Sequence, residues 1–101
     1  SGLPALYSAC WYLDHIEWGG DWQKYYKCEP FSFNGTVEQE SLVMGGEACM
    51  WAESVDSANV ISRVWPRASA AAERLWSEKD VTDIGNAEER LEEHTCRMRQ
   101  R

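Results

Sequence analysis

The chain of 101 residues is long enough for one small domain or for part of a larger one. Its 17 acidic and 10 basic residues give a formal net charge of −7, which argues against a nucleic-acid partner because phosphate binding needs a basic surface. No apolar run approaches the ~20 residues that a membrane-spanning helix requires.

Two segments predict β-strands. Residues 5–14, ALYSACWYLD, are mostly apolar, include aromatic side chains and contain no Gly or Pro. Residues 42–50, LVMGGEACM, form the second candidate, and their paired glycines suit the close approach of a neighbouring element. Residues 15–36 predict a loop with short helical pieces, and residues 54–62 predict a further loop.

The long loop carries a sequon for N-glycosylation, because Asn34 begins Asn-Gly-Thr in a stretch rich in turn residues. Together with four cysteines, the sequon favours a protein of the secretory pathway. The four cysteines are Cys10, Cys28, Cys49 and Cys96, and they allow three sets of pairings if all of them are bridged. They form no C-x-x-C, and His15 and His94 are isolated, so the sequence predicts neither a metal site nor a cofactor.

Two helices are predicted to follow. Residues 65–79, WPRASAAAERLWSEK, place Pro66 where a first helical turn tolerates it. Apolar side chains then recur at helical spacing, with alanines that let the helix lie close against a sheet, at Ala68, Ala71, Ala72 and Leu75. Residues 86–101, NAEERLEEHTCRMRQR, predict a second helix capped by Asp83 or Asn86, with one apolar stripe at Ala87, Leu91, Thr95 and Met98.

The order strand, loop, strand, loop, helix, helix indicates an α/β fold. Two strands alone do not make a stable sheet. Nearly all-apolar strands with glycine suit a parallel sheet that helices cover. We therefore expect residues 1–101 to be part of an α/β barrel or sheet and not a complete domain.

Both predicted strands end with an aromatic side chain followed, two residues on, by a carboxylate. Because side chains alternate along a strand, Tyr12 and Asp14 would share one face if the extended conformation persists, and so would Trp51 and Glu53. A sugar fits this pairing, since its apolar face stacks on a ring and its hydroxyls donate to carboxylates. In α/β barrels the carboxyl ends of the strands build the active site.

Glu47 lies deeper in the second predicted strand. A lone buried charge is costly, so the expected environment is a buried carboxylate held by an arginine. The candidates are Arg63, Arg67 and Arg74, all of which we expect to be structural.

Three motifs, SACWYLD, GGEACMWAE and RVWPRASAAAERLWS, closely resemble the C-terminal part of the catalytic domain of β-N-acetylhexosaminidases in glycoside hydrolase family twenty, which includes animal lysosomal enzymes. The resemblance covers nearly the whole chain. It implies a (β/α)8 TIM barrel of which residues 1–101 form the last two strands and the closing helices. It also implies a lysosomal or secreted enzyme that is a dimer at full length.

The resemblance implies a retaining, substrate-assisted reaction in which terminal β-linked GlcNAc or GalNAc is removed from glycolipids, glycoproteins or chito-oligosaccharides. The acetamido oxygen of the substrate attacks the anomeric carbon, a Glu acts as acid and then base, and an adjacent Asp orients the acetamido group. That Asp-Glu pair belongs to an earlier strand that this sequence does not contain, so the isolated chain is expected to be inactive.

By similarity, Tyr12 is the catalytic residue of this segment, whose hydroxyl binds the acetamido oxygen. Trp51 lines the pocket around the sugar, Glu53 accepts from the distal hydroxyls, and Asp14 lies near the 6-hydroxyl. Relatives that accept sulfated sugars carry Asn-Arg at the positions where this chain has Asp14 and His15. We therefore expect a preference for neutral substrates, which protonation of His15 at acidic pH would weaken.

Cys10 and Cys28 depart from the family pattern and could pair with each other. Cys96 resembles a cysteine whose partner lies after Arg101, and Cys49 is expected to be a buried thiol. Two other functions compete with the enzyme: a secreted carbohydrate-binding module that uses Tyr12 and Trp51 as platforms, and a structural domain in which the aromatic side chains form the core.

Overall fold

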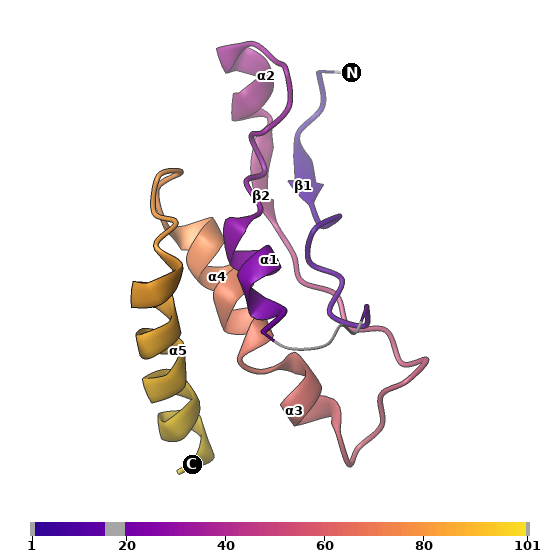
Figure 1. The fold of residues 1–101 in the computed structure, drawn as a ribbon. Helices are drawn as coiled ribbons and strands as arrows, with labels where there is room; N and C mark the ends of the chain where they lie inside the picture. The colour runs from indigo at the N-terminus through magenta and orange to yellow at the C-terminus, as the bar shows by residue number, and fades with distance from the viewer. Residues whose placement is uncertain (1, 16–19, 101) are drawn as a thin grey trace.

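The computed structural model describes residues 2–15 and 20–100, which form a short sheet with helices beside it (Figure 1). None of the helices in these residues combines the length and the apolar character that a membrane crossing requires. In chain order the elements are β1 (Ala5–Tyr7), α1 (Trp22–Lys27), α2 (Val37–Ser41), β2 (Val43–Gly46), α3 (Val60–Val64), α4 (Arg67–Trp76) and α5 (Ile84–Arg99).

The two strands pair in parallel, which confirms the expected strand direction. Leu6 lies opposite Gly45 and Tyr7 lies opposite Gly46, after a register shift at the start of β1. Gly46 is required here, because a Cβ atom at this position would overlap the Trp11 ring and the Tyr7 carbonyl oxygen. The glycine therefore lets the strand approach the aromatic core closely.

The prediction of one continuous strand over residues 5–14 is wrong. The chain leaves the ladder after Tyr7 and turns, with the Trp11 N–H donating to the Ser8 carbonyl oxygen at 2.9 Å. This turn buries the Trp11 side chain completely, and its ring meets the Tyr7 ring edge-on at 5.6 Å. The second predicted strand likewise ends at Gly46. Pairing resumes only as a single parallel bridge between Tyr12 and Cys49.

The core joins this N-terminal region to the helices. Helix α1 packs against α4 (Figure 1), and the side chains of Ala70 and Ala71 are buried at that level. Such small side chains let neighbouring elements come close. Helix α5 adds Ala87 and Leu91 to the same core. The full set of buried apolar residues is Trp11, Leu13, Tyr25, Tyr26, Ala70, Ala71, Ala87 and Leu91.

Both long helices are confirmed, with differences in detail. Pro66 precedes α4 as its N-cap residue, and Ala72 is exposed instead of facing a sheet. Asp83 caps α5, since its Oδ1 atom accepts from the Asn86 N–H at 3.1 Å. Helix α2, where Thr36 and Gln39 form a capping box, was not predicted, and the start of α3 falls in a segment that was predicted to be a loop.

A disulfide joins Cys10, in the turn after β1, to Cys28 at the end of α1. The pairing that the sequence allowed is therefore present. Cys49 is a free thiol and is half-buried, and Cys96 is free and exposed on α5. The bridge connects the turn after the first strand directly to the end of the helix that packs against α4.

Candidate functional site

Three of the predicted site residues lie together in a turn at the end of the first strand segment. We call residues 12–15 the site turn. The Tyr12 ring stacks on the His15 ring, with 5.6 Å between centroids and 26° between planes. The Asp14 Oδ2 atom lies 3.9 Å from Nε2 of His15, whose side chain is 72% exposed. A phenol, a carboxylate and an imidazole thus meet at one surface.

Arg67, at the start of α4, fixes the site turn from beneath. Its Nη2 atom donates to the Leu13 carbonyl oxygen at 2.5 Å. Its Nη1 atom forms an ion pair with Asp21 Oδ2 at 2.9 Å, and both side chains are almost entirely buried. The planar guanidinium can serve two acceptors at once, which an ammonium group does less well. Arg67 therefore ties the turn to α1 and α4 together.

Tyr25 of α1 makes the second attachment. Its hydroxyl donates to the Tyr12 carbonyl oxygen at 3.4 Å, while its own carbonyl oxygen accepts from the Trp11 indole N–H at 3.0 Å. Burial raises the pKa of the Tyr25 phenol above its usual value, and the nearby Arg67 charge offsets part of that rise. The phenol therefore keeps the proton with which it donates to the turn.

Asp14 has one carboxylate oxygen that is free to accept. Its side chain is 15% exposed, and Oδ1 is buried with no hydrogen-bond partner in the part of the chain that the structure describes. A buried oxygen without a donor is unfavourable by about 1–3 kcal/mol. Because Oδ1 is shielded from solvent in this arrangement, a ligand hydroxyl does not reach it without a local rearrangement of the turn.

Trp51 and Glu53 lie on the segment that follows Cys49, the bridge partner of Tyr12. Trp51 is 57% exposed, and Glu53 is exposed in a turn. Across residues 2–15 and 20–100, no hydrogen bond or ring contact joins either side chain to the site turn. The same-face pairs depended on an extended conformation, which does not persist at Asp14 or at Glu53, so strand alternation does not place either pair.

The prediction of a buried Glu47 is also wrong, because the side chain is exposed. Two of the three arginines proposed as its partners are used elsewhere. Arg67 binds Asp21, while Arg74 is buried and donates to backbone carbonyl oxygens of the loop after α4, those of Glu78 and Val81. The expected structural role of Arg67 and Arg74 is confirmed, although neither holds Glu47, and the structural role of the Arg63 side chain stays a prediction.

The sequon lies away from the site turn. Asn34 is exposed in the bend before α2, and the Thr36 hydroxyl oxygen accepts from the Gln39 N–H at 3.2 Å.

Within the described ranges no group of three or more His, Cys, Asp and Glu side chains is placed to hold a metal ion. An interhelical hydrogen bond of 3.0 Å joins Ser69 of α4 to His94 of α5.

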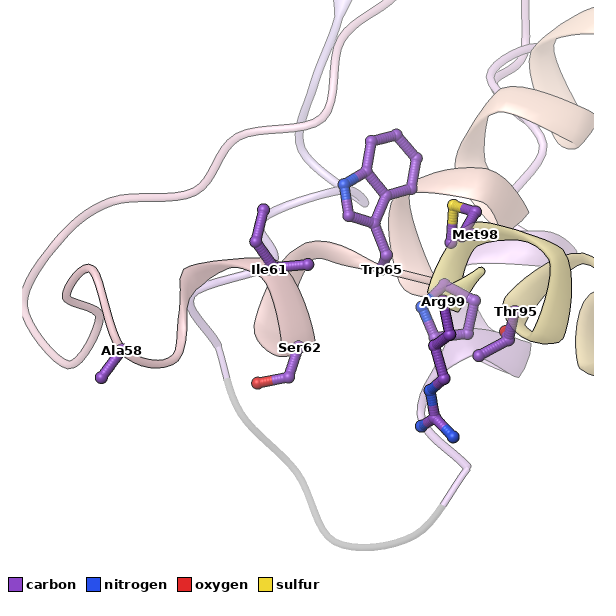
Figure 2. Close-up of a pocket in the computed structure, with 8 residues that line it drawn as sticks. Ala58, Ile61, Ser62, Trp65, Thr95, Met98 and Arg99 are labelled. Atoms are coloured by element: carbon purple, nitrogen blue, oxygen red, sulfur yellow. The ribbon is translucent and has the colours of Figure 1, made fainter. Parts of the chain in front are cut away.

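A groove of about 780 Å³ lies between α3 and the end of α5 (Figure 2). Its lining is mainly apolar and includes none of the predicted site residues. The lining residues are Ala58, Ile61, Ser62, Trp65, Pro66, Thr95, Met98 and Arg99. We place the candidate site at the turn and not in this groove, because the turn holds the convergent polar groups that recognition needs.

Sequence reasoning missed the part that Tyr25 plays and named Arg67 only as a structural residue. An arginine just after a proline at a helix start carries no pattern that identifies its acceptor 54 residues away. The aromatic pair Tyr25–Tyr26, both buried, was the one local signal that α1 faces the core.

Comparison with known proteins gives a consistent assignment. Residues 2–79 match the profile of the glycosyl hydrolase family 20 catalytic domain. The chain is 59% identical over 98 residues to the beta-hexosaminidase subunit beta of Mus musculus, covering 97% of this chain and 18% of that protein. It is 57% identical over 101 residues to subunit beta of Homo sapiens and 52% identical to subunit alpha of Bos taurus, covering 100% of this chain and 18% and 19% of those proteins. It thus spans about a fifth of each relative.

Proposed function

The chain belongs to glycosyl hydrolase family 20, and on that premise we propose that residues 1–101 are the C-terminal part of a (β/α)8 catalytic barrel. The parallel pairing of β1 with β2 supports this assignment. So does the exposure of apolar side chains on the strands, since Leu6 is 62% and Met44 is 72% exposed. In a barrel, neighbouring strands and helices cover such surfaces.

We propose further that the full-length protein is a retaining β-N-acetylhexosaminidase. The acetamido oxygen of a terminal GlcNAc or GalNAc attacks the anomeric carbon as the leaving group departs, and water later opens the cyclic intermediate with retention. The acid and base for both steps lie outside this segment. Lysosomal or secreted location and dimeric assembly belong to the same proposal, and the Cys10–Cys28 disulfide supports an oxidising compartment.

In this reaction Tyr12 donates a hydrogen bond to the acetamido oxygen, orienting it and stabilising the charge that develops. Trp51 packs against the sugar, Glu53 accepts from its distal hydroxyls, and Asp14 accepts near the 6-position. The observation that carries the assignment is the family match over residues 2–79, which includes all of these positions. The Asp14 carboxylate, with 15% of its side chain exposed at the turn, supports hydroxyl recognition there.

An assay of the full-length protein with a chromogenic β-GlcNAc substrate tests this proposal. We expect turnover with retention of configuration, and we expect Glu53→Gln to raise KM by roughly ten-fold through loss of charged hydrogen bonds. Binding without hydrolysis would overturn the enzyme assignment and favour a carbohydrate-binding module instead.

The substrate preference follows from the charge at the turn. The Asp14 carboxylate repels an anionic 6-substituent, so plain GlcNAc substrates should be hydrolysed faster than 6-sulfated ones. The His15 imidazole lies beside this carboxylate, with Nε2 3.9 Å from Asp14 Oδ2, and is the neighbouring basic group that opposes the repulsion when it carries a proton. Comparison of the two substrates across the acidic range decides the matter, and equal rates throughout would contradict a role for Asp14.

A further inference from the structure

We propose that Tyr25 and Arg67 are positioning residues that hold Tyr12 in its productive orientation through the backbone of the site turn. This inference rests on the proposed function, because it assigns a purpose to contacts beneath the residue that would bind the acetamido group. Neither side chain is placed to touch the substrate itself, since Tyr25 is fully buried and Arg67 is 8% exposed.

The need for positioning arises from the break in the first strand. A residue inside a sheet is held by ladder hydrogen bonds on either side. Tyr12 lies beyond the end of β1 and keeps a single bridge, in which the Cys49 N–H donates to the Trp11 carbonyl oxygen and the Leu13 N–H donates to the Cys49 carbonyl oxygen. After Leu13 the chain turns away from the ladder, and the Tyr12 carbonyl oxygen accepts a hydrogen bond of 3.3 Å from the His15 N–H within the turn.

Tyr25 and Arg67 tie the turn to the helices with two further hydrogen bonds. The Tyr25 hydroxyl donates to the Tyr12 carbonyl oxygen, and Arg67 Nη2 donates to the Leu13 carbonyl oxygen. The two side chains also support each other, since Arg67 Nη1 lies 3.4 Å from the Tyr25 hydroxyl oxygen and its guanidinium carbon lies 5.8 Å from the ring centroid. Two successive peptide groups of the turn are thereby fixed.

Arg67 is in turn held from two other directions. Its Nε atom donates to the Arg63 carbonyl oxygen at 2.8 Å, and its Nη1 atom pairs with Asp21. The guanidinium therefore has few alternative orientations, and its position is set by α1, α3 and α4 together. A small displacement of a group that acts in the transition state lowers the rate steeply. Rigid support beneath Tyr12 is thus a direct requirement of the proposed chemistry.

The test is a double-mutant cycle in the full-length enzyme, with kcat and KM measured on a chromogenic β-GlcNAc substrate. Tyr25→Phe removes one hydroxyl and keeps the buried ring. We expect kcat to fall about five-fold, the effect of one lost hydrogen bond, while KM changes by less than about two-fold. The matched control is Tyr26→Phe, which removes the neighbouring buried hydroxyl on the same helix and should leave kcat within about two-fold.

The second arm places Tyr25→Phe in a Tyr12→Phe background. If Tyr25 acts through Tyr12, its removal should then change kcat by less than about two-fold, because the hydroxyl it positions is already gone. An equal loss in both backgrounds, or no loss in the parent, would overturn the inference. A parent without turnover would overturn the proposed function and the inference with it, so the two failures are distinguishable.

Arg67→Lys provides an independent variant. It keeps a positive charge for Asp21 but replaces the planar fork with a single ammonium group, so one acceptor loses its donor. We expect Arg67→Lys to lower kcat in the parent, and we expect this decrease to be absent in the Tyr12→Phe background. A loss that follows only the melting temperature, and is the same in both backgrounds, would show a purely structural role and overturn the inference.

Discussion

Arg67 and Asp21 form an ion pair between α4 and α1, with 2.9 Å between Nη1 and Oδ2 and with 10% and 11% of the two side chains exposed. The pair lies directly beneath the site turn, since the same guanidinium binds the Leu13 carbonyl oxygen. One buried side chain thus connects the helix packing to the residues proposed to bind substrate.

Truncation of this arginine should be strongly destabilising. Arg67→Ala leaves Asp21 buried without its partner, and we expect a loss of about 3–5 kcal/mol in the free energy of unfolding. The control is Arg97→Ala, which breaks a 3.0 Å pair with Glu93 in which both side chains are over 60% exposed (62% and 65%). That pair should contribute less than ~1 kcal/mol. Denaturant unfolding of the full-length protein measures both, and similar losses would contradict the buried role of Arg67.

The raised pKa of Tyr25 predicts a stability change at alkaline pH. Burial favours the neutral phenol, so its contribution is fully present below about pH 10, the usual tyrosine value. It is lost as the pH rises from there through the higher pKa of the folded state, where ionisation also removes the donor to Tyr12. Melting temperatures from pH 8 to 11 should therefore fall less in Tyr25→Phe than in the parent. Parallel curves would contradict this linkage.

The disulfide should stabilise the junction between β1 and α1. Cys10 and Cys28 are 18 positions apart, and a bridge over that length contributes about 3 kcal/mol by restricting the unfolded chain. Cys28→Ser should lower stability by that order. Cys96→Ser changes an exposed free thiol and should have an effect within about 0.5 kcal/mol. Thermal unfolding without reductant separates the two variants, and a neutral Cys28→Ser would contradict the prediction.

Asn34 is expected to carry an N-linked glycan when the protein passes through the secretory pathway, because the side chain is exposed before α2. Asn34→Gln and Thr36→Ala should both abolish the shift in gel mobility that glycan removal produces, whereas Thr36→Ser should preserve it. Thr36→Ala also removes the N-cap of α2 and should destabilise the protein by ~1 kcal/mol. An identical mobility of parent and Asn34→Gln would contradict glycosylation.

The long helices and the Asp83 cap could be predicted because they depend on local patterns. The parallel pairing is a long-range contact, and it could be predicted because apolar strands with glycine are typical of a parallel sheet that helices cover. The capping box at Thr36 and Gln39 is also a local signal that the sequence carries, although α2 was not among the predicted elements. The end of the first strand at Tyr7 is different. An apolar segment around Trp11 has the same composition whether it stays extended or turns inward, and the choice depends on Tyr25, a partner 14 residues away.

In the site, too, what depends on neighbouring residues could be predicted and what depends on distant residues could not. Tyr12, Asp14 and His15 could be grouped because they are near in sequence, and the structure keeps them together. Their relation to Trp51 and Glu53 was inferred from the carboxyl ends of neighbouring barrel strands and from the family resemblance, and no contact between the described residues joins the two groups. Glu47 was assigned to the wrong environment for a similar reason, since burial is set by the surrounding elements and not by strand position.

The measurement that tests the central claim most directly is the kcat of Tyr12→Phe in the full-length enzyme, on a substrate with a terminal β-linked GlcNAc. Loss of a donor that stabilises developing charge should lower kcat on the order of 10²-fold, with a much smaller change in KM. Tyr7→Phe, which removes a phenolic hydroxyl 3.3 Å from Cys10 Sγ, is the control and should retain nearly full activity. An unchanged kcat in Tyr12→Phe would contradict the assignment of this segment to substrate binding.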